Sequence, residues 1–197
     1  TNQWERPIYF VYPGSTRSIM SIEKYCSLEG YCMRFLPVHA PNYIQGLGGI
    51  NMDKSYDLYM NKFHWGRINE PDVFVDKETY HNAVSYRNKF ALLAQTLMQN
   101  NRNDSALKIL NKSIKLFPSA KIPYDLYTLA YVQMYFKLGQ KEKATKLMNE
   151  INQYYLEILT YYESFKGNYA ACVEQEKNQA VQILQSIKRL KQDFNQQ

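Results

Sequence analysis

The side chains that could carry out catalysis or bind a metal are scattered along the sequence. His39, His64 and His81 are far apart, and no His-x-x-x-His or Cys-x-x-Cys arrangement is present, so the sequence predicts no metal site. No Gly-x-Ser-x-Gly segment is available to hold a serine nucleophile. The sequence therefore predicts a non-catalytic chain that needs neither a metal nor a cofactor.

Two further patterns approach a functional motif without completing it. Asp53 and Asp57 would share one helix face, but carboxylates in a first turn are explained by the helix dipole. The glycine-rich segment 42–51 has Asn51 where a dinucleotide-binding loop needs its third glycine, and no Lys-Ser or Lys-Thr pair follows it. We interpret this segment as a flexible connection.

Two segments between residues 90 and 151 repeat the same spacing of small and large residues. Ala106 and Ala144 take the small position at which two helices of a hairpin cross, and they are 38 residues apart. Tetratricopeptide repeats usually recur every 34 residues, and the additional length fits a lengthened loop at residues 118–123. We expect two tetratricopeptide-like helical hairpins; the alternative is an ordinary pair of helical hairpins.

The first helix of each hairpin would line a concave surface of the kind that repeat proteins use to bind partners. Amide side chains on that surface suit the backbone of an extended peptide. The residues predicted to face the groove are Asn88, Gln95, Met98, Gln99, Gln133, Phe136 and Lys137. The alternative is that another part of the chain, such as the N-terminal strand region, fills the groove.

The two ends of the chain predict different structure. Residues 1–85 read as a small α+β portion with strands at 1–12 and 29–38 and a helix at 53–65, whereas residues 86–197 read as the helical repeat region, closed by a capping helix at about 169–194. The fold class is therefore mainly α with a small α+β N-terminal portion. Trp4, Trp65 and Arg67 could form a stacking platform for a sugar, although tryptophans more often lie in a core.

The distribution of charge argues against a nucleic-acid partner, and the cysteines leave one disulfide open. The formal net charge of +6 is concentrated in the helical half, because residues 1–85 hold 8 basic and 9 acidic side chains. The basic residues are mostly lysines spaced along helices, without an arginine cluster or a nucleic-acid motif, so no nucleic acid is expected. Cys26 and Cys32 could pair if they lie on neighbouring strands.

The chain resembles the soluble C-terminal region of a bacterial family of multi-spanning membrane proteins, which in turn resemble protein O-mannosyltransferases of the GT-C glycosyltransferase class. The segments that carry this resemblance cover most of residues 1–118. They are residues 4–10 (WERPIYF), 28–31 (LEGY), 34–38 (RFLPV), 59–63 (YMNKF), 65–66 (WG), 71–73 (PDV) and 86–88 (YRN).

The resemblance implies a parent enzyme whose membrane-embedded part takes a sugar from a polyprenyl-phosphate donor. In such enzymes the catalytic acidic residue lies in a loop near the membrane surface, before the soluble region, so no residue of this chain inherits that role. The sequence has no apolar run long enough to span a bilayer and no signal peptide, and it begins at Thr1 without Met, so we expect a mature product or an excised piece. The resemblance implies that the longer protein is a membrane protein. The implied location is the periplasmic face of the inner membrane, with the membrane-embedded domain and a protein or peptide acceptor as partners. The alternative is a free-standing peptide-binding scaffold.

Overall fold

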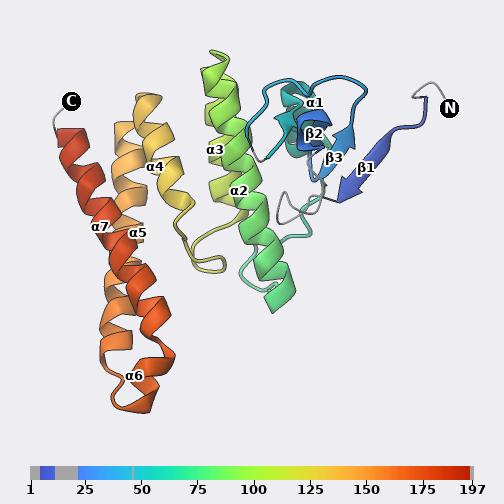
Figure 1. Cartoon of the computed structure of the whole chain (residues 1–197). Coiled ribbons are helices and arrows are strands. Elements are labelled where there is room, and N and C mark those ends of the chain that lie inside the picture. Colours follow the sequence, from blue (N-terminus) through green and yellow to red (C-terminus); the bar gives the residue numbers. More distant parts are fainter. Residues whose placement is uncertain (1–4, 12–21, 46, 196–197) are drawn as a thin grey trace. The chain divides into compact units, whose positions relative to one another are not determined.

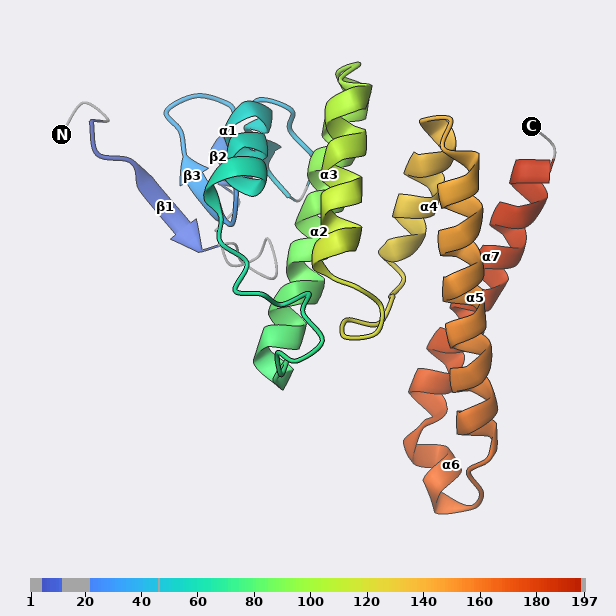
Figure 2. The same cartoon turned by 180° about the vertical axis from the view of Figure 1, so that it is seen from behind.

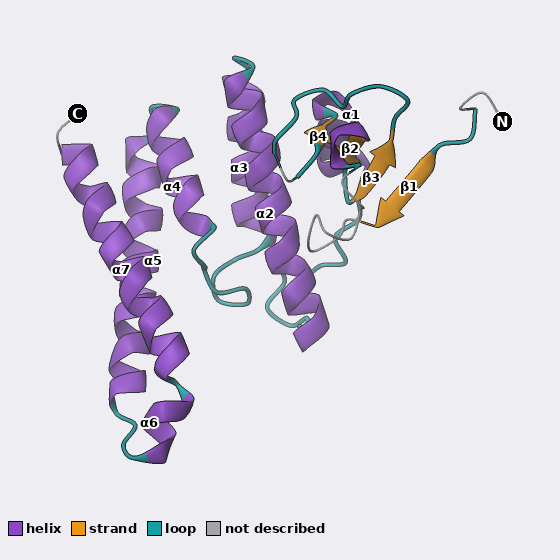
Figure 3. Cartoon of the chain, viewed as in Figure 1, coloured by secondary structure: helices purple, strands orange, loops and turns teal. Residues whose placement is uncertain are grey.

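A computed structural model describes residues 5–11, 22–45 and 47–195 of the chain. It is mainly helical with a small sheet near the N-terminus, which confirms the predicted fold class (Figures 1 and 3). The contacts divide the chain into a first unit, Thr1–Ile122, and a second unit, Pro123–Gln197. The elements are β1 (Ile8–Val11), β2 (Cys26–Glu29), β3 (Cys32–Phe35), β4 (Gly49–Ile50), α1 (Met52–Asp57), η3 (Leu58–Lys62), α2 (Lys77–Gln99), α3 (Asn103–Leu116), α4 (Thr128–Lys137), α5 (Lys141–Glu163), α6 (Asn168–Cys172) and α7 (Glu174–Asn195), with a short 3-10 turn, η2, at Glu23–Tyr25.

The sheet of the first unit has the strand order β1-β3-β2-β4. β3 pairs antiparallel with both β1 and β2, and β4 runs parallel to β2. The strand predicted at residues 29–38 is present as the shorter β3, whereas β2 was not predicted; Gly30, with φ +64°, reverses the chain between the two strands. Cys26 and Cys32 do lie on neighbouring strands, but Cys26 is opposite Phe35 and both thiols are free.

The described end of the glycine-rich segment forms β4, and a Cβ atom added at Gly49 would lie 2.3 Å from the Pro41 carbonyl oxygen. Glycine is needed here because two backbone segments approach closely. Asn51 then begins α1 by accepting a hydrogen bond from the Lys54 N–H (3.2 Å). The predicted helix at 53–65 is shorter, since α1 passes into the π-helical turn η3 and ends before Phe63.

α2 and α3 form the helical hairpin of the first unit. Phe90, Leu93 and Leu97 of α2 are buried, and Ala106 of α3 is fully buried, as a close helix crossing requires. Asn101, with φ +59°, lies in the turn between the two helices. The predicted domain boundary between residues 85 and 86 falls inside α2, whereas the contacts divide the chain after Ile122.

The second unit contains the hairpin of α4 and α5, with α7 packed along α5. Ala144 is fully buried at the position equivalent to Ala106, and Gly139, with φ +74°, ends α4. Figure 2 shows α5 and α7 side by side, with α6 at the far end of the pair. The predicted capping helix is thus present as α6 and α7, while assignment of the hairpins to the tetratricopeptide class stays a prediction.

Candidate functional site

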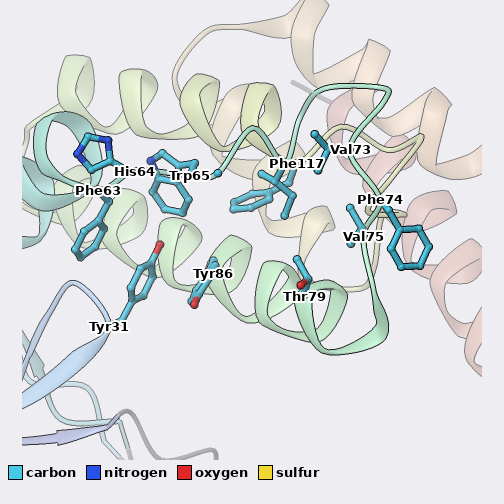
Figure 4. Close-up of a pocket in the computed structure, with 12 residues that line it drawn as sticks. Tyr31, Phe63, His64, Trp65, Val73, Phe74, Val75, Thr79, Tyr86 and Phe117 are labelled. Atoms are coloured by element: carbon cyan, nitrogen blue, oxygen red, sulfur yellow. The ribbon is translucent and has the colours of Figure 1, made fainter.

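A pocket of about 450 Å³ lies within the first unit, and most of its wall is aromatic (Figure 4). We call it the aromatic pocket. Its side chains come from the β2–β3 turn, the segment after η3, the loop before α2, α2 itself and the end of α3. The lining residues are Tyr31, Phe63, His64, Trp65, Gly66, Ile68, Val73, Phe74, Val75, Thr79, Tyr86 and Phe117.

The β2–β3 turn holds Tyr31 in the pocket wall, and helix α1 with η3 fixes this turn. The Gly30 N–H donates to Ser55 Oγ (3.1 Å), and the Gly30 carbonyl accepts from the Tyr59 hydroxyl (2.8 Å). Ser55 Oγ in turn donates to the Leu28 carbonyl (3.1 Å). Because all of these bonds are buried, the turn, and with it Tyr31, is held in a single position.

The aromatic rings of the pocket pack mainly against one another. The Tyr31 ring is stacked between Phe63 and Tyr86, with ring centroids 4.8 Å and 4.1 Å away. Trp65 meets its neighbours edge to face at centroid distances of 5.8–6.2 Å; these neighbours are Tyr31, Phe63, Tyr86 and Phe117. Both faces of Tyr31 are therefore covered by protein, and neither can stack on a ligand.

Two polar atoms of the pocket wall are buried without a hydrogen-bond partner in the described part of the chain. They are the Tyr31 hydroxyl and Trp65 Nε1. Burial raises the pKa of Tyr31, so the hydroxyl keeps its proton and remains a donor. Buried polar groups in proteins are nearly always satisfied, and two unsatisfied donors in an apolar wall point to a ligand that carries acceptor oxygens.

Two cationic side chains, the buried Arg87 and the half-buried Lys121, fix the backbone around the pocket. Arg87, which is fully buried, donates to the carbonyls of Phe117 (3.3 Å) and Ile122 (2.6 Å) and so fixes the end of α3 behind the pocket. Lys121 donates to the carbonyls of Glu70 and Val73 and thereby holds the loop that forms one wall. These bonds satisfy carbonyl groups that no helix or sheet ladder pairs.

Lys89 lies next to the stacked tyrosines of the pocket. Its Nζ atom is 5.8 Å and 5.7 Å from the ring centroids of Tyr31 and Tyr86, and it donates to Ser85 Oγ (2.7 Å). Burial lowers the pKa of Lys89 to about 8, because a low-dielectric surrounding disfavours the charged ammonium. The cation rests on the aromatic cluster from the side of α2.

The rim of the pocket is formed by more exposed residues. His64 is exposed, and Phe74 is 87% exposed on the loop that precedes α2; Figure 4 shows its ring turned away from the other side chains. The Thr79 hydroxyl is occupied by a bond to Asp76 (3.0 Å) at the start of α2. The opening therefore offers apolar surface and few free polar groups.

The predicted sugar platform is only partly present. Trp65 lines the pocket, but its ring is packed by its neighbours, and Trp4 lies outside the described residues. Arg67 is exposed and absent from the pocket wall, because its guanidinium pairs with Glu70 and Asp72 (3.4 Å to Asp72). The structure does not bring Trp65 and Arg67 together as one recognition surface.

The predicted groove residues lie on one helix in each unit. On α2, Asn88, Gln95 and Gln99 are exposed and Met98 is half-buried; on α4, Gln133 and Lys137 are exposed and Phe136 is half-buried. Phe136 is covered by Phe194 of α7, with stacked rings 3.8 Å apart, so α7 occupies this part of the predicted surface. A peptide groove along these residues stays a prediction.

Sequence reasoning missed Tyr31, Phe63 and Tyr86 as neighbours of Trp65. A usable signal was the repeated spacing of four between aromatic residues, which puts Tyr59 and Phe63 on one side of a helical segment and Tyr86 and Phe90 on one side of α2. The position of Tyr31 depends on the turn at Gly30, which the single predicted strand concealed. Among the described residues, no group of histidine, cysteine and carboxylate side chains is placed to hold a metal.

Residues 1–54 match the family described as TMEM260-associated domain 2. The match covers the four strands and ends within α1, and it includes Tyr31. It links the N-terminal portion to a TMEM260-like family, in line with the predicted association with a membrane protein. No curated protein and no solved structure matches the chain. In the part of the chain that the structure describes, no helix combines the length and apolar character that a bilayer crossing requires.

Proposed function

We propose that this chain is a non-catalytic binding module of a membrane-associated protein and that it holds a peptide segment in the aromatic pocket. The observation that carries the proposal is the pair of buried, unsatisfied donors, Tyr31 Oη and Trp65 Nε1, in an otherwise apolar wall. Backbone carbonyls of an extended peptide would accept from these donors, while a bulky apolar side chain of the peptide would fill the cavity.

A peptide fits the pocket better than a sugar does. Carbohydrate sites use open aromatic faces, whereas Tyr31 is stacked on both sides and Trp65 is surrounded by ring edges. The lining residues also include no carboxylate and no charged amine, and such groups would favour a ligand with many hydroxyls or an opposite charge. A neutral, largely apolar segment matches this composition.

The wider setting is part of the same proposal. The resemblance to GT-C membrane proteins and the match of residues 1–54 to TMEM260-associated domain 2 support a role beside the membrane-embedded part of a glycosyltransferase-like protein. In this setting, on the periplasmic face of the membrane, the module would present a protein acceptor to the active site of the parent or hold a partner near it.

The fluorescence of Trp65 provides a direct test of the pocket. The chain has two tryptophans, so Trp4→Phe leaves Trp65 as the single reporter. We would titrate short alanine-based peptides with leucine, phenylalanine, lysine or aspartate at the centre, together with a set of oligosaccharides. We expect a saturable change in Trp65 emission with the leucine and phenylalanine peptides and none with the charged ones.

Tyr31→Phe is the matched variant for the hydrogen bond. It removes one unsatisfied donor without removing a bond within the described protein, so the fold should be kept while peptide binding weakens by roughly 5- to 10-fold. Tyr169→Phe, at a site 73% exposed, is the control and should bind like the parent. Saturation by an oligosaccharide alone, or an unchanged affinity in Tyr31→Phe, would reject the peptide proposal.

A further inference from the structure

Helices α5 and α7 of the second unit, which we call the α5–α7 hairpin, are well packed over only half of their length. Every buried residue of α5 lies at or before Ile151, and the first buried residue of α7 is Ala180. Residues 152–179, which we call the distal half, contain no buried side chain. The proximal half of the hairpin has a core and the distal half has none.

The cause is the length of α4. α4 has 10 residues and α5 has 23, which correspond to about 15 Å and about 35 Å of helix. The Tyr155 hydroxyl donates to the carbonyl of Tyr124 (2.8 Å), just before α4 begins, so α4 starts beside the middle of α5. Beyond this point the described part of the second unit offers only α5, α7 and the five-residue α6 at their far end, and so thin a layer cannot enclose its apolar residues.

The distal half is nevertheless rich in apolar residues. Leu156 is 45% exposed, Tyr161 is 61% exposed and Tyr169 is 73% exposed. The corresponding part of the proximal half, residues 141–151 and 180–194, has no large apolar side chain that is exposed to this degree. Leu156 and Tyr161 belong to α5 and Tyr169 to α6, so the exposed apolar side chains of the second unit's helical part fall in its distal half, where they favour a docking role.

The charges of the hairpin change sign along its axis. The distal half carries four carboxylates (Glu157, Glu163, Glu174 and Glu176) and two lysines (Lys166 and Lys177). The proximal half carries six cations (Lys141, Lys143, Lys146, Lys188, Arg189 and Lys191) and three carboxylates (Glu142, Glu150 and Asp193). The net charge is therefore −2 at the distal end and +3 at the proximal end.

We propose that the hairpin of α5 and α7 is a self-association surface that pairs antiparallel with the same hairpin of a second copy of this chain. A two-fold axis near the middle of the hairpin would lay the acidic distal half of each copy on the basic proximal half of the other. Leu156 would lie close to the axis, and Tyr161 would meet the lysine stems of its partner.

A second copy suits this surface better than a lipid bilayer. Tyrosine and leucine are also typical of membrane-interface segments, but anionic lipid headgroups attract clusters of lysine and arginine. The distal half has a net negative charge and would be repelled by an anionic membrane. The hairpin itself supplies the complementary positive surface.

Sedimentation velocity on the full chain tests the proposal. We expect a monomer–dimer equilibrium in the micromolar range at low salt that shifts towards monomer at high salt, because salt screens the charge pairs. Leu156→Glu with Tyr161→Glu should weaken the dimer by at least about tenfold, with unchanged circular dichroism. Val38→Glu, at a residue of the first unit that is 62% exposed, is the matched control and should dimerise like the parent.

A charge exchange tests the antiparallel arrangement. Lys146→Glu with Lys188→Glu should weaken the dimer, as should Glu157→Lys with Glu163→Lys, and the four changes together should restore it. A chain that stays monomeric at all concentrations, a dimer indifferent to Leu156→Glu with Tyr161→Glu, or a fourfold variant that fails to recover would overturn the proposal. Vesicle binding by a strictly monomeric chain would assign the surface to lipid instead.

Discussion

Aromatic residues reach full burial in the aromatic cluster of the first unit, whereas those in the distal half of the second are exposed or half-buried. In the first unit, the rings of Phe90 and Tyr59 stack 4.6 Å apart, and both are fully buried. In the second unit, Tyr161 and Tyr169 are mostly exposed. The difference shows that residue type alone does not decide burial: an aromatic side chain becomes core only where enough chain segments converge to surround it.

The two regions differ in the number of chain segments that surround their aromatic rings. In the first unit, the β2–β3 turn, η3, the loop before α2 and the α2–α3 hairpin all contribute side chains to one cluster. In the distal half, the described part of the second unit contributes only α5, α7 and the five-residue α6. A large ring needs contacts on both faces and its edges to be enclosed, and so few segments cannot supply them.

Phe90→Ala should break the first unit more severely than any change to an exposed ring. The side chain is fully buried against Tyr59, Trp65 and Phe117, so its removal should lower the free energy of unfolding by about 3–5 kcal/mol. Tyr161→Ala should cost less than about 0.5 kcal/mol. Urea unfolding followed by Trp65 emission in the Trp4→Phe background measures the first, and circular dichroism measures both. Equal losses in the two variants would contradict the contrast.

Two glycines sharpen the same comparison at the level of the backbone. Gly30 and Gly139 both have positive φ, but a Cβ at Gly30 would lie 2.7 Å from Phe63 Cζ, while one at Gly139 would meet nothing within 4 Å. Gly139→Ala should therefore lower the free energy of unfolding by only about 1–2 kcal/mol, which is the cost of placing a residue with a Cβ in the left-handed conformation. Gly30→Ala should cost about 3 kcal/mol, because Phe63 must also move. If urea denaturation gave the same loss of unfolding free energy for Gly30→Ala and Gly139→Ala, the Phe63 side chain would be able to move aside without cost.

Lys89 should give the first unit a characteristic dependence of stability on pH. Its pKa is lowered from 10.5 to about 8 in the folded chain, so the unfolded chain binds more protons above pH 8 and the free energy of unfolding rises with pH. We expect a gain of about 2 kcal/mol between pH 8 and pH 10. Above pH 10 the trend should reverse, because Tyr9 and Tyr31 of the first unit have raised pKa values and the unfolded tyrosines lose their protons first.

Lys89→Met tests this assignment, since it keeps an apolar stem and removes the charge. The rise between pH 8 and pH 10 should disappear in urea titrations of the variant. Lys108→Met, at an exposed position of α3, is the control and should keep the rise. If the free energy of unfolding failed to rise between pH 8 and pH 10 in both variants, the pH dependence would come from the net charge of the chain and not from Lys89.

Helical periodicity allowed most of the helical part to be predicted. The two helical hairpins and the small residues Ala106 and Ala144 at their crossings followed from spacing alone, because close helix crossings leave a signal every three or four residues. The last helical segment, predicted at about 169–194, is present as α6 and α7. These features are encoded by neighbours in the chain.

The aromatic pocket could not be predicted, because its wall joins residues that are far apart in sequence. Tyr31 and Tyr86 stack although 55 positions separate them in the chain, and nothing local to either residue indicates the other. The turn at Gly30 was hidden within an apparently continuous alternating pattern. Trp65 was selected as a candidate for its type, but its neighbours decide whether it stacks on a ligand or on protein.

The bonds from Lys121 to the carbonyls of Glu70 and Val73 bear on the order of folding. The loop at residues 66–76 has little regular structure of its own and takes its shape from a side chain about 50 positions further along the chain. Local helices form within microseconds, whereas contacts of such separation need a loop to close first. The wall of the aromatic pocket should consequently be among the last parts of the first unit to fold, after the α2–α3 hairpin has brought Lys121 into place.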